Sequence, residues 1–341
     1  MKSVSLICIL VFLFTCSLVG VAEAAVDSDW RIESLITLPS AATSFSYSSD
    51  GTLIAVGHAN GSVTIWEIKT GKLLSTLKAH EKEVNTVQFA STGSFLVTIG
   101  DDNRARVWST KDWSEKGSID GVAFSGAVSP DGRWLAGQDA KQTICIWDMA
   151  TLKKIKELTE SGKGGTKNMS FSADGKYLAT PFSHALLINV ETKQPLELVA
   201  AGDKKTPVKI EQTGKDQFSF SLGKLQDDDA ITHSVATSRT SALVALGRGW
   251  YGQPSFVDVW DISAMKRLGR YKPKDSGVLA SFSFDNALVA IEGGENATIW
   301  NIANNKKIAT VKGGGLVQFS PTSIELAVTD ENKLVFYVPK S

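Results

Sequence analysis

Short apolar runs alternate with turn residues along most of the chain. Between residues 44 and 80 four such runs, rich in β-branched or aromatic residues, are separated by Ser, Asp, Asn and Gly. The runs are Ser44–Tyr47, Leu53–Val56, Val63–Ile68 and Lys72–Leu77. The two middle runs are almost purely apolar, which is typical of strands covered on both faces. Because one small four-stranded sheet cannot bury two faces alone, the pattern predicts further copies packed beside it.

The copies are marked by the residue that ends each third run. This residue is Trp66, Trp108, Trp147, Asn189, Trp260, Trp300 and Tyr337 in turn. Successive markers are 37 to 42 residues apart, with one interval of 71. That period is the length of a four-stranded propeller blade. Asp-Gly pairs at 50, 131 and 174 recur between the first and second runs, where a hairpin turn requires them.

The two ends of the pattern complement each other. The seventh copy stops at Val338 without a fourth run, while the first run after the N-terminal segment, Trp30–Pro39, resembles a fourth run standing alone. The sequence therefore predicts an all-β, seven-bladed β-propeller of four-stranded antiparallel blades. Its last blade is closed by the N-terminal strand, so that no blade is left with an open edge.

The long interval contains an insertion around residues 202–230. Within it, Val208–Gln212 and Gln217–Leu222 alternate in polarity and flank the turn residues 213–216. This favours an inserted hairpin. A degenerate half-blade is the alternative.

The third runs also resemble those of the WD-repeat β-propeller family over about residues 30–338. The residues that carry the resemblance are Ile65-Trp66-Glu67, Val107-Trp108-Ser109, Ile146-Trp147-Asp148, Val259-Trp260-Asp261 and Ile299-Trp300-Asn301. The resemblance implies a structural hydrogen-bonded tetrad in the second blade, formed by His80, Thr98, Asp102 and Trp108. In the first blade, Val56 and Asn60 occupy the positions that correspond to Thr98 and Asp102, so the first blade does not match the tetrad. The family resemblance implies a protein-binding platform.

The N-terminal segment 1–24 has the pattern of a signal peptide. Lys2 precedes the apolar run Leu6–Phe14, and Ala22-Glu23-Ala24 offers a cleavage site after Ala24. We therefore expect an exported, periplasmic or secreted protein whose propeller occupies residues 25–341. An uncleaved membrane anchor is the alternative. Cleavage would leave Cys145 as the single cysteine, and its apolar surroundings predict a buried, inert thiol.

Charge and motifs exclude several function classes. Lys and Arg number 36, as do Asp and Glu, and no long basic block is present, which argues against nucleic-acid binding. No nucleotide-binding or nucleophile-elbow motif occurs. His58 and His184 fall in loops between second and third runs, on one face, but neither has a partner at ligand spacing. We therefore expect no metal and no cofactor.

The loops between second and third runs form the face that we expect to contact a partner. The loop 247–255 is the longest of them and carries Trp, Tyr and Arg, the residue types that anchor interfaces. The candidate partner-binding residues are His58, Asp101, Asp139, His184, Arg248, Trp250 and Tyr251. The sequence thus predicts a monomeric, non-catalytic protein-interaction scaffold. An exported propeller enzyme or small-ligand binder that uses the central channel is the alternative.

Overall fold

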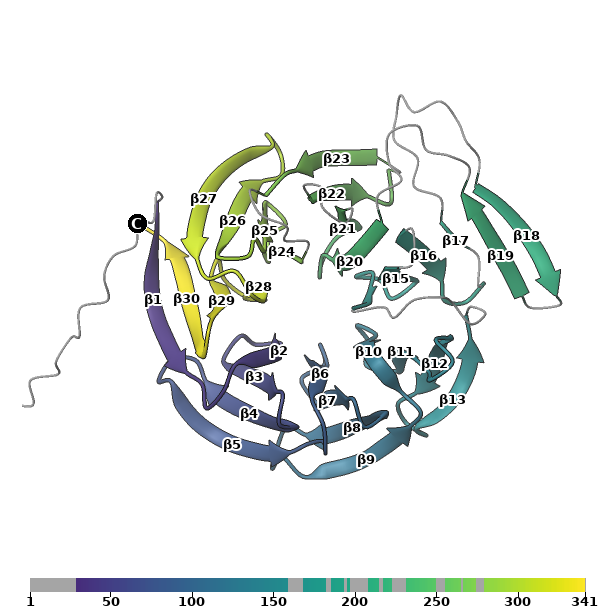
Figure 1. Cartoon of the computed structure of the whole chain (residues 1–341), viewed down its shortest axis with the longest axis horizontal. Coiled ribbons are helices and arrows are strands. Elements are labelled where there is room, and N and C mark those ends of the chain that lie inside the picture. The colour runs from purple at the N-terminus through teal and green to yellow at the C-terminus, as the bar shows by residue number, and fades with distance from the viewer. Residues whose placement is uncertain are drawn as a thin grey trace, which may run out of the picture.

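The computed structural model describes residues 29–158, 168–181, 185–192, 195–196, 208–214, 217–222, 231–249, 255–264, 266–273 and 279–340. These residues form a ring of seven four-stranded antiparallel sheets, the blades, and one separate two-stranded sheet (Figure 1). The described part of the chain contains no helix that could cross a membrane. The ring confirms the predicted seven-bladed propeller.

Blades one to four follow each other in chain order, each running from an inner strand at the channel to an outer strand at the rim. Blade one consists of β2 (Ala42–Tyr47), β3 (Leu53–His58), β4 (Ser62–Glu67) and β5 (Lys72–Lys78). Blade two consists of β6 (Val84–Phe89), β7 (Phe95–Gly100), β8 (Arg104–Ser109) and β9 (Glu115–Asp120). Blade three consists of β10 (Ala123–Val128), β11 (Trp134–Gln138), β12 (Ile144–Asp148) and β13 (Lys153–Glu157). Blade four consists of β14 (Ser170–Phe171), β15 (Tyr177–Pro181), β16 (Ala185–Asn189) and β17 (Pro195–Leu196).

The two-stranded sheet comes next and interrupts the series. It pairs β18 (Val208–Gly214) with β19 (Gln217–Leu222) and lies outside the ring in Figure 1. Blade five consists of β20 (Ile231–Thr237), β21 (Leu243–Gly249), β22 (Phe256–Asp261) and β23 (Lys266–Tyr271). Blade six consists of β24 (Ala280–Phe282), β25 (Leu288–Ile291), β26 (Asn296–Asn301) and β27 (Lys306–Lys312). The sequence 202–230 thus holds a hairpin.

Blade seven joins the two ends of the chain, as the sequence predicts. It consists of β28 (Val317–Phe319), β29 (Leu326–Asp330), β30 (Lys333–Pro339) and, as its outer strand, β1 (Trp30–Thr37). The pairing of β1 with β30 runs from Trp30 opposite Pro339 to Thr37 opposite Lys333. The ring is therefore closed by backbone hydrogen bonds and by side-chain packing.

The core lies between blades as well as within them. One cluster joins Ile65 and Leu77 of blade one to Val87, Leu96 and Trp108 of blade two, all of them buried. A comparable cluster joins blades six and seven and includes Trp30. The two middle strands of a blade are buried on both faces because each face packs against a neighbouring blade, which explains their continuous apolar runs.

Serine and aspartate fix the turns between first and second strands. In blade one, Ser48 Oγ donates to Asp50 Oδ1 at 2.6 Å, and Gly51 follows with φ of 72°. The Ser129–Asp131 and Ser172–Asp174 pairs repeat this bond, at 2.6 and 2.7 Å. Glycine accommodates the positive φ at no steric cost. All of these turns lie at one end of the inner strands, and the partner-binding candidates belong to loops at the other end.

Candidate functional site

The second blade contains a buried hydrogen-bonded chain built from the four residues expected to form the tetrad. His80 Nδ1 lies 2.8 Å from Asp102 Oδ1, and His80 Nε2 lies 2.8 Å from Thr98 Oγ1. The Trp108 indole N–H donates to Thr98 Oγ1 at 3.0 Å. One tautomer satisfies the four tetrad residues: Nδ1–H donates to Asp102, and Nε2 accepts from the Thr98 hydroxyl. Arg106 Nη1, which lies 2.8 Å from Nδ1, then donates to Asp102 Oδ2 at 2.9 Å. Thr98 is fully buried, so the network fixes strand and loop against each other.

The first blade builds a similar chain from different positions. His58, at the end of β3, places Nε2 2.8 Å from Thr64 Oγ1 of β4, and Nδ1 3.1 Å from Ser40 Oγ. The Trp66 indole N–H donates to Thr64 Oγ1 at 2.9 Å. His58 has none of its surface exposed. The interpretation of His58 as a partner-binding residue is therefore wrong, because its ring belongs to a buried structural network.

Arg248 is also engaged within its blade. Its Nη1 lies 3.7 Å from Asp258 Oδ2, and the Arg248 side chain is 12% exposed. Arg270 holds the same carboxylate through Nε and Nη2, both at 2.8 Å. The two guanidinium groups lie 5.8 and 4.1 Å from the centre of the Phe256 ring. The prediction that Arg248 faces a partner is wrong, since the fully buried Asp258 holds it inside blade five.

Two candidates remain at the surface of the described part. Asp101 is exposed in the loop after β7, where it accepts a hydrogen bond from the Asn85 amide. Asp139 is half-buried in the loop after β11, and its Oδ1 accepts the backbone N–H groups of Lys141 and Thr143, both at 2.9 Å. His184, Trp250 and Tyr251 lie outside the described residues.

The inner strands surround a central channel with a volume of about 860 Å³. Its wall is about equally polar and apolar, and the hydroxyl and amide side chains in it include Thr43, Ser44, Asn85, Gln88, Asn168, Ser170, Thr237 and Gln318. Arg239 adds one positive charge, and Glu83 and Asp101 add two negative charges. Such a mixed lining offers both hydrogen-bonding groups and apolar surface to an inserted side chain.

At the mouth of this channel on the side of Asp101, the pairing between the inner and second strands is irregular. The inner and second strands lose register near Thr43 in blade one, Asn85 in blade two, Phe124 in blade three and His233 in blade five. The first three of these residues line the channel. A bulge re-aims a side chain without changing the rest of the strand, and bulges are frequent beside functional sites.

Phe124 is the most unusual of these residues. It has φ of 63°, and 44% of its surface is exposed. A bulky side chain in the left-handed region is strained, and strain of this kind is concentrated at binding and catalytic sites. This exposed aromatic ring lines the same channel as Asn85 and Asp101 and offers it an apolar anchor. The sequence does not reveal this role, because Phe124 occupies an ordinary strand position in the repeat.

Burial also governs the titration of the two structural histidines. Burial lowers the pKa of His80 despite the hydrogen bond to Asp102, and burial lowers the pKa of His58. Burial alone would raise the pKa of Asp102, but hydrogen bonds from Arg106 and His80 outweigh it and hold that pKa below the ordinary value. Both rings are therefore neutral in the folded protein at neutral pH.

We expect the free energy of unfolding to fall as the pH drops below about 6.5, the ordinary histidine pKa. The unfolded chain binds protons there more readily than the buried rings do. The stabilisation is fully present above that pH and is lost toward the lowered folded-state pKa. Urea midpoints measured at about pH 7.5 and 5.5 test this. The difference between the two midpoints should be smaller in the variant His58→Asn. An unchanged difference would contradict the conclusion that His58 is a buried, neutral ring.

Two family models match parts of the chain. The model described as "Anaphase-promoting complex subunit 4 WD40 domain" matches residues 30–92, and the model described as "WD domain, G-beta repeat" matches residues 114–148. The β-propeller domain of Cps50 (Swd1) from Myceliophteria thermophila superposes with a TM-score of 0.71, over 90% of this chain and 99% of that one. Its sequence identity is 13%, so this likeness shows the fold alone.

Curated relatives match over shorter stretches. WD repeat and SOCS box-containing protein 1 from Xenopus tropicalis is 34% identical over 110 residues, which are 31% of this chain and 26% of that protein. The LEC14B protein from Lithospermum erythrorhizon is 26% identical over 147 residues, which are 40% of this chain and 30% of that protein. The matched stretches thus span less than a third of these relatives. Together with the seven four-stranded blades and the repeated Trp at the end of the third strand, these partial matches support a WD-repeat β-propeller family for the chain.

Proposed function

We propose that the protein is an exported, non-catalytic scaffold that binds a protein partner at the channel mouth formed by Asn85, Asp101 and Phe124. WD-repeat propellers typically serve as protein-interaction scaffolds. The observation that carries the proposal is the exposed, strained Phe124 at a bulge in the channel wall, which the exposed carboxylate of Asp101 also lines. Aromatic side chains anchor interfaces, and a nearby acid selects for complementary charge. The partner would therefore present an apolar side chain together with a positively charged one.

Export is the second part of the proposal and rests on the N-terminal sequence. Cleavage after Ala24 would leave β1 intact, because that strand begins at Trp30. The same chain in a cytoplasmic fraction, at its full mass, would contradict export. The alternative use of the channel by an enzyme or a small-ligand binder draws less support from the described residues. His58, one of the two histidines on the loop face, is buried in the structural network of blade one.

Affinity capture from the envelope or culture fraction tests the proposed surface. We expect Phe124→Ala to reduce the partner retained by about tenfold or more, because losing an aromatic anchor at an interface hot spot costs about 2 kcal/mol or more and about 1.4 kcal/mol is already tenfold. Asp101→Asn should weaken retention less and reduce its dependence on salt. The mass of the bait recovered from that fraction reports whether residues 1–24 have been removed.

The matched control is Phe284→Ala. Phe284 is a similarly exposed aromatic residue, 39% against 44%, but it lies in the turn after an inner strand, at the opposite end of the blades. Equal losses for the two variants would refute the channel-mouth surface. Retention of no protein, with a small molecule instead raising the melting temperature of the chain, would favour the ligand-binding alternative.

A further inference from the structure

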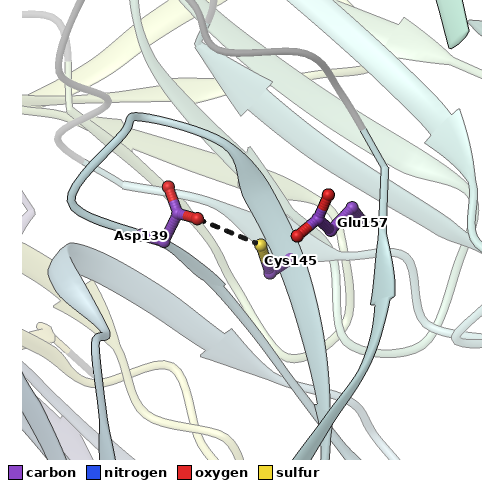
Figure 2. Close-up of side chains that lie close together, drawn as sticks. All are labelled: Asp139, Cys145 and Glu157. Carbon is purple, nitrogen blue, oxygen red and sulfur yellow. Dashed lines mark hydrogen bonds between the residues drawn. The ribbon is translucent and has the colours of Figure 1, made fainter.

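Three potential metal ligands converge at one edge of blade three. Asp139, Cys145 and Glu157 each offer one ligand atom, and these atoms all lie within 4.8 Å of one another. Figure 2 shows the Cys145 sulfur between the two carboxylates, with its contact to Asp139 Oδ2, at 3.9 Å, drawn as a dashed line. This cluster lies away from the channel and takes no part in the proposed partner surface.

The fold holds these three groups in place. Cys145 on β12 and Glu157 on β13 are direct cross-strand partners, so the register of the blade keeps them adjacent. Asp139 uses Oδ1 to accept the N–H groups of Lys141 and Thr143, which directs Oδ2 toward the sulfur. Cys145 is fully buried, while Asp139 is half-buried and Glu157 is exposed. The two carboxyl-bearing residues are therefore more exposed to solvent than the thiol, and movement of the exposed Glu157 side chain would give a cation access to the sulfur.

The equivalent positions in blades two and five have a different set of side chains from the cluster in blade three. Cys145 lies two residues before Trp147, as Asp258 lies two residues before Trp260 in blade five. There the cross-strand partner of Asp258 is Arg270, whose guanidinium binds the carboxylate through two bonds of 2.8 Å. In blade two the corresponding residue is Arg106, which donates to Asp102 at 2.9 Å.

Blade three thus has acidic groups where two other blades pair an acid with an arginine. Its cross-strand pair is a thiol and a carboxylate, with a second carboxylate beside them. Among the described residues, the positively charged side chain at this cluster is that of Lys154. It is exposed and donates a hydrogen bond to Glu157 at 2.6 Å. A bound cation would fill the role that arginine fills in blades two and five, and would hold the loop after β11 to the outer strand β13.

We propose that Asp139, Cys145 and Glu157 bind a divalent zinc ion. A thiolate combined with two carboxylates suits the borderline softness of zinc, whereas calcium and magnesium prefer oxygen ligands alone. The ion would replace the thiol proton, which leaves to solvent, and a water molecule would complete a tetrahedral site. Zinc bonds of about 2.0–2.3 Å require the three ligand atoms to close slightly from their present separations, which the exposed Glu157 side chain permits. Our sequence-based expectation of no metal rested on histidine spacing, and this cluster contains no histidine.

Cadmium titration provides a direct test. The full chain carrying Cys8→Ser and Cys16→Ser retains Cys145 as its only thiol, so a thiolate-to-cadmium charge-transfer band in the near ultraviolet reports this residue alone. We expect the band to saturate at one cadmium ion per chain and to disappear when zinc is added in competition. Zinc affinity is then measured by calorimetry on the same protein.

Single substitutions identify the ligands. Cys145→Ser should abolish the band, and Asp139→Asn and Glu157→Gln should each weaken zinc binding by about tenfold or more. Glu81→Gln, which removes an exposed acid from the loop before β6, should leave zinc affinity unchanged. Circular dichroism establishes that each variant is folded. Absence of the band in the folded parent chain, or equal zinc affinity in the parent and Cys145→Ser chains, would overturn the proposal.

Discussion

Replacing Trp30 with alanine is expected to destabilise the propeller by about 3–5 kcal/mol, the usual cost of truncating a buried aromatic side chain. Trp30 is 3% exposed and belongs to the core cluster shared by blades six and seven. Its ring meets that of Phe319 edge to face, with centroids 6.3 Å apart. The loss is a large share of the stability of an ordinary domain. Urea denaturation of both proteins, monitored by far-ultraviolet circular dichroism, measures the change in the free energy of unfolding.

The position of Trp30 makes this substitution a test of ring closure as well as of core packing. It begins β1, which is held in the ring only through β30 and through packing, because no chain connection joins β1 to the rest of blade seven. The matched control is Ile32→Ala on the same strand, where 44% of the side chain is exposed and a change within about 0.5 kcal/mol is expected. Equal destabilisation by the two substitutions would show that β1 does not close the ring.

The fold was predictable because its signals are local and repeated. The tryptophan at the end of the third strand recurs in five blades, and turns such as Ser48–Gly51 impose the same hairpin each time. Closure by the N-terminal strand could be inferred from an incomplete last copy and an unmatched first run. Each inference needed only spacing and residue type, which the sequence contains in full.

The candidate site was less predictable because its residues depend on contacts between strands. Comparing blade one with blade two at equivalent positions predicted no tetrad in blade one. The structure nevertheless shows a similar hydrogen-bonded chain there, formed by His58 and Thr64 from neighbouring strands. One signal was available: threonine two residues before the tryptophan. It occurs again in blade six, where the Trp300 indole donates to Thr298 at 3.1 Å.

The environments of Arg248 and Phe124 could not be inferred from spacing. Whether an arginine at the end of a strand faces solvent depends on its cross-strand neighbours, and here Asp258 lies within reach. The bulge in β10 inserts two residues, Phe124 and Ser125, between the paired Ala123 and Gly126, and the sequence pattern of the inner strand does not reveal it, so Phe124 could not be assigned to the channel. Local patterns specify strands and turns, whereas the site depends on register.

Thr98→Val is expected to cost about 2–4 kcal/mol, although valine has nearly the same shape as threonine and favours strands. The hydroxyl of Thr98 links two buried partners, since it contacts His80 Nε2 at 2.8 Å and accepts from the Trp108 indole at 3.0 Å. Its removal leaves both of them unsatisfied in the interior, and each carries a desolvation cost of about 1–3 kcal/mol. Urea denaturation at neutral pH measures the change in the free energy of unfolding.

Two further variants distinguish the loss of the buried hydrogen bonds from the general effect of replacing threonine with valine. Thr64→Val in blade one should cost a similar amount, because Thr64 makes the equivalent contacts with His58, at 2.8 Å, and with Trp66, at 2.9 Å. Thr76→Val, at an exposed position opposite Thr64 on the outer strand β5, should change stability by less than about 0.5 kcal/mol. If Thr64→Val behaves like Thr76→Val, the chain in blade one does not stabilise the fold, and His58 would be buried for its packing alone. If both Thr64→Val and Thr98→Val are costly, neighbouring blades have reached the same hydrogen-bonding solution with residues from different strands.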